Sequence, residues 1–138
     1  MIGKEGDETL KEICLEIQGR YEINFVEIGA DRDHVHFLIQ SVPTYSPTEI
    51  VTTVKSITGR MMFEKRPEIK KMLWGGNFWT SGYYINTVGA SGNEEAIQRY
   101  VKTQGRGGEY KEIHRGQLFL FDTPGLAPAG FFIQVNFL

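Results

Sequence analysis

The stretch "YEINFVEIGADRDHVHFLIQ", residues 21–40, contains two β-strand patterns separated by the charged triplet "DRD". Its first half is rich in β-branched and aromatic residues, and residues 34–40 alternate in the manner of a strand. The alternation sends neighbouring side chains to opposite faces: His34, His36, Leu38 and Gln40 to one, and Val35, Phe37 and Ile39 to the other. The stretch therefore predicts a β-hairpin that carries two of the chain's three histidines on one strand face.

Helical patterns flank this hairpin. Before it, apolar residues recur over residues 8–18 at the spacing of one helix face. After it, Ser46 is placed to cap a helix with Pro47 in the first turn, and Glu49 completes a capping box. An apolar stripe then runs toward a helix end near Pro67: Ile50, Val54, Ile57 and Met61. Two amphipathic helices are expected.

The second half of the chain predicts one more strand and one more helix. The glycine-bounded block "GGNFWTSGYYINTVG" is typical of a loop followed by a strand, over about residues 82–88. Asn93 can cap the last helix, and Gly105 is a natural stop for it.

Composition indicates one domain inside the cell. The 138 residues are enough to bury a core, and the sequence has no apolar run of the length that spans a membrane. The charged start lacks the apolar stretch of a signal peptide, so we expect a cytoplasmic protein. Cys14 is the only cysteine, which excludes an intramolecular disulfide and a multi-cysteine zinc site.

The formal charge of −2 hides a division along the chain. Residues 1–33 hold four Lys/Arg against nine Asp/Glu, whereas residues 55–72 hold six against two. Residues 99–115 hold five Lys/Arg against two Asp/Glu. A local basic surface that binds nucleic acid is therefore compatible with the acidic whole.

The paired histidines have two interpretations. On a strand, the α-carbons of His34 and His36 lie roughly 6–7 Å apart, close enough for both imidazoles to bind one metal ion. Alternatively, they are two polar residues on a solvated sheet face. Asp33 either orients one imidazole or serves the turn.

A second group of polar residues is expected on the last helix. Tyr100 and Gln104 stand four residues apart and so share a helix face. The alternative is that Tyr100 packs its ring against the sheet, with Gln104 at the solvated end of the helix.

Four motifs together carry a family resemblance: "DHVHFLI", "LWGGNFWTSGYYINTVG", "RYVKTQ" and "EYKEIHRGQLFLF". In this order and spacing the chain resembles the single-tyrosine, histidine-hydrophobe-histidine transposases of IS200-type insertion sequences, over about residues 9–121. The resemblance implies a ferredoxin-like α+β fold, with helices on one face of an antiparallel sheet. It also implies a homodimer that cleaves and rejoins single-stranded DNA bearing hairpins near the element's ends.

The resemblance assigns roles to four residues. His34 and His36 match the family's metal ligands, Gln104 matches the third ligand, and Tyr100 matches the nucleophile. The cofactor would be Mg²⁺ or Mn²⁺, since imidazole suits Mn²⁺ and oxygen ligands suit Mg²⁺. The product would be a 5′-phosphotyrosine with a free 3′-hydroxyl. Because one phosphodiester replaces another, rejoining needs no ATP.

Basic and aromatic residues are candidates for DNA contacts. Phosphate contacts are expected from Lys55, Arg60, Lys65, Arg66 and Lys102. The candidates for stacking on unpaired bases are Trp74, Phe78, Trp79, Tyr83 and Tyr84. For the basic residues the alternative is a solvated helix face, and for the aromatic residues it is a place in the core.

The chain departs from the family at both ends. Members usually begin with a further strand, central to the sheet, whereas this chain starts at the first helix. We expect residues 1–121 to form the transposase catalytic domain and residues 122–138 to form a C-terminal extension. The extension ends in "GFFIQVNFL", which alternates like a strand. Two interpretations stay open: the extension fills the vacant place in the sheet of its own subunit or of its partner, or it is read-through sequence that stays disordered or packs loosely.

Two alternative functions also stay open. One is a domesticated relative that nicks chromosomal palindromes, or a replication-type nickase with the same metal motif. The other is a non-catalytic dimer that binds hairpin DNA.

Overall fold

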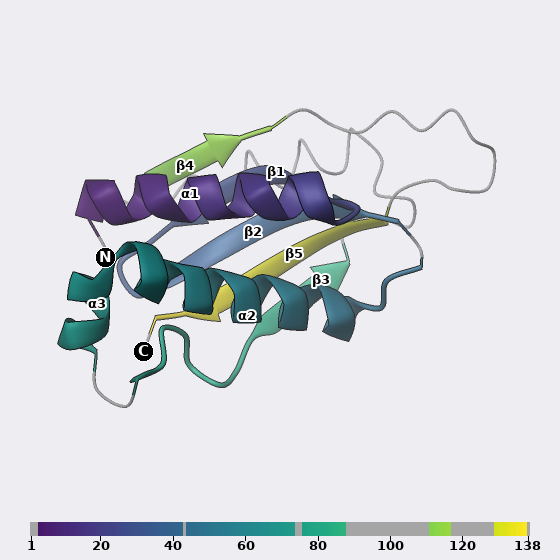
Figure 1. Ribbon diagram of the computed structural model, residues 1–138. Helices are drawn as coiled ribbons and strands as arrows, with labels where there is room; N and C mark the ends of the chain where they lie inside the picture. Colours follow the sequence, from purple (N-terminus) through teal and green to yellow (C-terminus); the bar gives the residue numbers. More distant parts are fainter. Residues whose placement is uncertain (1–2, 43, 74–75, 88–110, 117–128, 138) are drawn as a thin grey trace.

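The computed structural model describes residues 3–42, 44–73, 76–87, 111–116 and 129–137. These residues form three helices and one antiparallel sheet of five strands, in the order β3-β5-β2-β1-β4. The bounds are α1 Gly3–Arg20, β1 Ile23–Ala30, β2 His34–Ser41, α2 Pro47–Lys65, α3 Pro67–Met72, β3 Tyr84–Thr87, β4 Lys111–Arg115 and β5 Ala129–Asn136. Helices α1 and α2 lie side by side on one face of the sheet (Figure 1). The predicted α+β fold is confirmed.

The predicted hairpin is formed by β1 and β2. Their register runs from Ile23 opposite Ser41 to Ala30 opposite Val35, with a bulge between Phe25 and Glu27. The amide of Asp31 donates to the carbonyl of His34 over 2.9 Å and closes the turn.

Helix α2 begins as its sequence predicts. The hydroxyl of Ser46 accepts a 3.1 Å hydrogen bond from the amide of Glu49, and Pro47 occupies the first turn. The buried stripe differs from the expected one, because Ile57 and Met61 are only partly buried: its members are Ile50, Val51, Val54, Thr58 and Met62. The apolar pattern did not point to Thr58. This threonine is fully buried. Burial of its hydroxyl is tolerated because the hydroxyl donates a 2.6 Å hydrogen bond to the carbonyl of Val54.

Two elements were not expected. Pro67 starts the short helix α3 as well as ending α2, because proline is favoured at the first helical position. Residues 111–115 are mostly charged, so their sequence does not predict a strand. They form β4 because they pair with β1. The expected helix between Asn93 and Gly105 lies outside the described residues.

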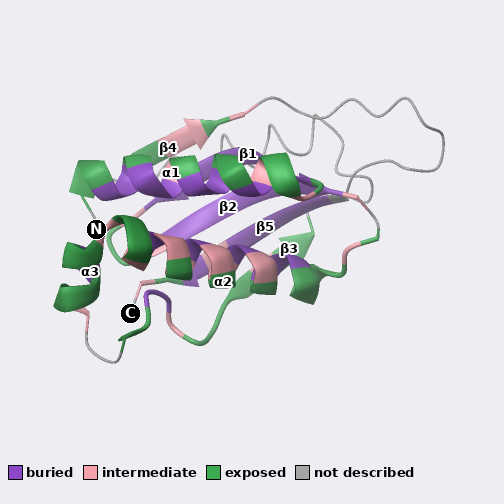
Figure 2. Ribbon diagram, viewed as in Figure 1, coloured by how far each residue is buried: buried purple, intermediate pink, exposed green. Residues whose placement is uncertain are grey.

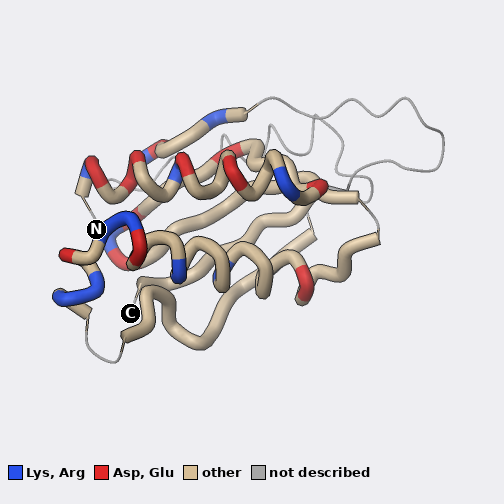
Figure 3. Tube along the Cα trace, viewed as in Figure 1, with Lys and Arg blue, Asp and Glu red and all other residues tan. Residues whose placement is uncertain are grey.

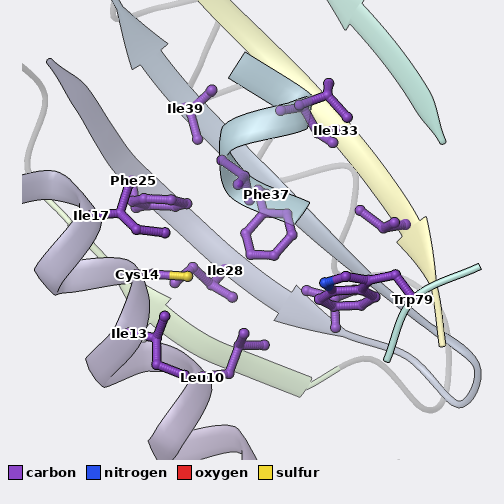
Figure 4. Close-up of a cluster of buried hydrophobic side chains, with 14 of the residues drawn as sticks. Leu10, Ile13, Cys14, Ile17, Phe25, Ile28, Phe37, Ile39, Trp79 and Ile133 are labelled. Carbon is purple, nitrogen blue, oxygen red and sulfur yellow. The ribbon is translucent and has the colours of Figure 1, made fainter. Parts of the chain in front are cut away.

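The core lies between the helices and the sheet. Figure 4 shows Leu10, Ile13, Cys14 and Ile17 of α1 beside Phe25 and Ile28 of β1. The ring of Phe37 on β2 meets those of Phe25 and Trp79 edge-on, at centroid distances of 5.8 and 6.3 Å. Figure 2 shows that β2 and β5 are buried along most of their length. In the part of the chain that the structure describes, no helix has the length and apolar content needed to span a membrane.

The C-terminal strand joins the middle of the sheet. Strand β5 pairs antiparallel with β2 over eight residue pairs, from His34 opposite Asn136 to Ser41 opposite Ala129. On its other side it pairs antiparallel with β3. The prediction that the tail forms a strand and joins the sheet beside β2 is therefore confirmed, within the same chain. The expected domain boundary after residue 121 lies outside the described residues.

We expect deletion of residues 124–138 to abolish cooperative folding. The deletion leaves the facing edges of β2 and β3 without the strand that lies between them, and it removes the fully buried Ile133 and Val135. Thermal melting followed by circular dichroism measures the effect. Val135→Asp should also abolish the transition, whereas Asn136→Asp, at an exposed position of the same strand, should leave it nearly unchanged. An unchanged melting transition in the deleted chain would contradict the central role of β5.

Candidate active site

His34 and His36 lie on the sheet face that points away from the helices. Val35, Phe37 and Ile39, which alternate with them along β2, belong to the core beneath α1 and α2. We call the opposite side, marked by His34, His36, Leu38 and Gln40, the histidine face. The sequence predicted that both histidines share one face of the strand, and the structure agrees. His36 is buried at 3% exposure, and the side chain of His34 is 21% exposed.

His36 belongs to a chain of polar groups that crosses three strands. Its Nε2 lies 3.1 Å from Oε1 of Glu27 on β1, and Glu27 is only 1% exposed. Oε2 of Glu27 lies 3.6 Å from the guanidinium of Arg115 on β4. Two hydrogen bonds, of 2.8 and 3.2 Å, hold Arg115 to Glu112, and they lower the pKa of the Glu112 carboxyl. The sequence analysis missed Glu27, although a lone carboxylate in the apolar strand "INFVEIGA" was a usable signal.

His34 contacts the residue before it. Its Nδ1 lies 3.0 Å from Oδ1 of Asp33, and this hydrogen bond lowers the pKa of the exposed Asp33 carboxyl. In the turn, the carboxylate of Asp31 accepts a hydrogen bond from the backbone amide of Arg32. Of the two interpretations of Asp33, the structure therefore favours orientation of the imidazole.

The expected metal ligands and nucleophile are only partly within the described residues. Tyr100 and Gln104 lie outside them, so their roles stay predictions. Among the residues that are described, no three His, Cys, Asp or Glu side chains converge as they stand to hold a metal ion.

Three of the basic residues expected to bind DNA have partners within the protein. Lys55 donates to the carbonyls of Thr80, Ser81 and Gly82 over 2.9, 3.2 and 3.2 Å, and burial lowers its pKa. Its ammonium thereby anchors the segment that leads into β3.

The other two partnered residues, at the end of α2, reach the acidic helix α1. Lys65 pairs with Glu16 at 3.1 Å, and Arg66 bonds to Glu5 and Thr9. Figure 3 shows acidic residues spaced along α1 and basic residues gathered where α2 meets α3. Much of the local positive charge is therefore balanced across the helix layer.

Arg60 differs from these three. It is exposed on α2, and no hydrogen bond or ion pair engages it among the described residues. It lines an open groove of about 580 Å³ between α2 and residues 76–83. Lys102, the remaining basic candidate, lies outside the described residues.

The aromatic candidates divide between core and surface. Trp79 is 6% exposed, stacks on Phe137 at a centroid distance of 5.3 Å, and donates its indole N–H to Thr58. It is therefore a core residue, and stacking on a base is excluded unless the core opens. Trp74 lies outside the described residues. Among the described residues of this block, Tyr83 and Tyr84 have exposed rings, at 46% and 54% exposure.

A smaller hollow lies beside the histidines. It is lined by Thr80, Gly82, Tyr83, Tyr84, Gln134 and Asn136. Gln134 is the register partner of His36, and Asn136 is that of His34. Thr80 and Tyr83 also line the larger groove, so the two hollows adjoin.

Comparison with known proteins identifies the family. Residues 1–104 match the family described as "Transposase IS200 like". The chain belongs to this family. It is 32% identical over 104 residues to the ISDra2 transposase TnpA of Deinococcus radiodurans. The matched region covers 75% of this chain and 73% of that protein.

More distant members of the IS200-like family also match. The chain is 30% identical over 82 residues to the transposases for insertion sequence element IS200 of Salmonella typhimurium and Salmonella typhi. These matches cover 59% of this chain and 53% of each Salmonella protein, so the chain matches about half of their length. No solved structure matches the chain.

We expect Arg60 to contribute more to DNA affinity than Arg66 does. Arg60→Gln should weaken binding of a single-stranded oligonucleotide and reduce the slope of log affinity against log salt by about 0.7, the value for one lost phosphate contact. Arg66→Gln is the matched control: its guanidinium is held by Glu5 and Thr9, so the slope should stay unchanged. Fluorescence anisotropy at several salt concentrations measures both. Equal slopes for Arg60→Gln and the unsubstituted chain would contradict this role.

Proposed function

We propose that this IS200-like transposase cleaves and rejoins single-stranded DNA at the ends of an insertion sequence, through a 5′-phosphotyrosine on Tyr100. A divalent ion held by His34, His36 and Gln104 assists the reaction. The observation that supports this most is the placing of both histidines on one face of the buried strand β2, beside the hollow lined by Gln134 and Asn136.

Two of the proposed ligands, His34 and His36, are among the described residues, and imidazole nitrogen is a donor that suits a divalent ion. Two imidazoles at alternate positions of a strand project the same way, and the strand that carries them is rigidly held on both sides by β1 and β5. A buried carboxylate oxygen lies next to one of them. Nitrogen and oxygen donors together suit Mn²⁺, and Mg²⁺ accepts the oxygen donors. When bound, the ion would neutralise charge that develops on the scissile phosphate.

Tyr100 supplies the covalent step. Its phenolate oxygen attacks the phosphorus, a new O–P bond forms, and the bond to the 3′ oxygen breaks. The 3′ oxygen leaves and takes up a proton as a hydroxyl. The phenol has an ordinary pKa of about 10, so the reaction at neutral pH needs a nearby positive charge or a proton acceptor. Rejoining is the same exchange run in reverse with another 3′-hydroxyl.

The two adjoining hollows offer a path for the DNA strand. The larger groove presents Arg60, and the smaller one ends beside the register partners of His34 and His36. Tyr83 and Tyr84 lie along this path with exposed rings, on which bases can stack. A single strand lying in both hollows would bring a phosphate toward the histidines.

We expect the chain to form a covalent adduct with a hairpin-bearing single strand in the presence of Mn²⁺ or Mg²⁺. Tyr100→Phe should abolish the adduct, since it removes only the attacking oxygen. The double variant His34→Ala, His36→Ala should reduce cleavage by at least about a hundredfold, because ion binding is lost. Denaturing gels of labelled DNA measure both.

The same gels separate the alternatives. An adduct that persists in Tyr100→Phe would exclude the proposed nucleophile. Hairpin binding without an adduct, and without a divalent-ion requirement, would identify a non-catalytic binding dimer. Cleavage of chromosomal palindromes by a chain whose flanking DNA lacks hairpin ends would identify the domesticated relative.

We also propose a homodimer in which the tyrosine of one subunit serves the histidines of the other. The proposal rests on the family resemblance and on the glycine-rich "GASGN" and "GRGG", which border the tyrosine helix expected from the sequence. Mixing Tyr100→Phe with the double histidine variant should restore cleavage to about a quarter to a half of the unsubstituted level. Absence of rescue, in a mixture shown to form heterodimers, would leave assembly within one subunit.

A further inference from the structure

The side-chain amides of Gln134 and Asn136 on β5 have no role in the function proposed so far. Gln134 lies opposite His36 and Asn136 lies opposite His34, so both amides belong to the histidine face. Among the described residues, neither side-chain amide has a hydrogen-bond partner. Strand β5 also lies outside residues 1–104, the part of the chain that matches the IS200-like family, so the match gives these amides no role.

We propose that Gln134 and Asn136 are specificity-determining residues, which select one unpaired nucleobase of the bound strand in the smaller hollow. The inference rests on the proposed function, because the base belongs to the same single strand of DNA. It adds the nucleotide that the protein itself recognises, close to the phosphate that reaches the histidines.

The smaller hollow has the size and the walls of a site for one base. Its volume is about 270 Å³, just below the range of about 300–1,000 Å³ that is usual for drug-sized ligands. Tyr84 lies opposite Gln134 on β3, and this tyrosine is 54% exposed. A base stacked on the ring of Tyr84 would present its edge to the two amides.

The walls of the hollow are held in place by the rest of the protein. The backbone amide of Thr80 donates to the carbonyl of Asn136 over 3.0 Å, which ties the segment before β3 to β5. The ammonium of Lys55 donates to three successive carbonyls of the same segment, residues 80–82. The hollow therefore keeps its shape without DNA, and less ordering is needed when a base binds.

Side-chain amides suit the recognition of a base edge. Each amide presents N–H donors beside an acceptor oxygen, and each nucleobase has its own order of donors and acceptors along its edges. An unpaired base leaves all of these edges open to the protein. The two amides can therefore distinguish bases, whereas a phosphate contact, such as the one expected of Arg60, carries no sequence information.

The hollow is close enough to the histidines to hold a base near the reacting phosphate. Directly opposite residues of antiparallel strands have α-carbons about 4.5–5.5 Å apart, and this spacing separates Gln134 from His36. Successive nucleotides of a stacked strand rise by about 3.4 Å. The selected base therefore lies within about one or two nucleotides of the phosphate at the histidines.

The affinity for single strands of one repeated nucleotide measures the selection. The probes are homopolymers of deoxyadenosine, deoxycytidine, thymidine and deoxyinosine, the last replacing deoxyguanosine, whose homopolymers self-associate. Every position carries the same base, so the register of the strand in the hollow does not matter. Fluorescence anisotropy with the full chain, in the presence of a chelator, should give affinities that differ by about fivefold or more between the best and the worst base.

The double variant Gln134→Met, Asn136→Leu tests the two residues. It keeps the approximate size of both side chains and removes both amides, so we expect the four affinities to converge to within about twofold. Binding of an abasic strand of the same length should stay unchanged, because the phosphate contacts remain. If the double variant lacks a cooperative melting transition, Asn136→Leu alone replaces it and should still reduce the difference by about twofold or more.

Asn86→Leu is the matched control. Asn86 is exposed on β3 and lies opposite Phe132, on the same face of the sheet, but it does not line the hollow. This variant should therefore keep the full difference among the homopolymers.

The outcomes separate this inference from the proposed function. Equal affinities for the four homopolymers in the unsubstituted chain, or a difference that survives the loss of both amides, would overturn the role of Gln134 and Asn136. A difference that Asn86→Leu also removes would overturn it as well. An adduct on Tyr100 without base selection would leave the transposase standing. Base selection without any adduct would support the subsite and overturn the proposed catalysis.

Discussion

The hydrogen-bonded pairing of β5 with β2 and β3 is the constraint on which the rest of the structure depends. A sheet cannot bury an unpaired strand edge, and β2 carries both the core residues under the helices and the two histidines. Strand β5 satisfies the edge of β2 along its whole length. In a ferredoxin-like βαββαβ sheet the first strand holds this central place, antiparallel to both neighbours. Here β5 holds it.

The two faces of β2 have different roles: one packs into the hydrophobic core, and the other carries the polar side chains of the candidate site. On one face Phe37 packs between Phe25 and Trp79, and the helices cover the cluster. On the other face the side chains of His36 and Gln40 are buried but polar, and each has a polar partner on β1. Because both faces are fixed by the same backbone, packing under the helices also holds the histidines in position.

Electrostatics in the helix layer explains why a basic segment does not by itself make a basic surface. The positive residues at the end of α2 lie against the acidic α1, and Lys65 and Arg66 form ion pairs across this contact. Lys55 is turned inward to three carbonyls before β3. Charge counting along the sequence cannot detect such pairing, because the partners are up to 61 residues apart.

The sequence by itself determined the local elements. Alternation in residues 34–40 placed His34 and His36 on one face, and the Ser46, Pro47 and Glu49 signals fixed the start of α2. These features depend on residues a few positions apart, so their physics is contained in the local pattern. Only the tertiary structure decided that β5 lies between β2 and β3, that Trp79 is buried, and that Glu27 meets His36. Each of these depends on contacts between segments distant in the chain, where pairing and packing choose among partners that the local pattern leaves equally suitable.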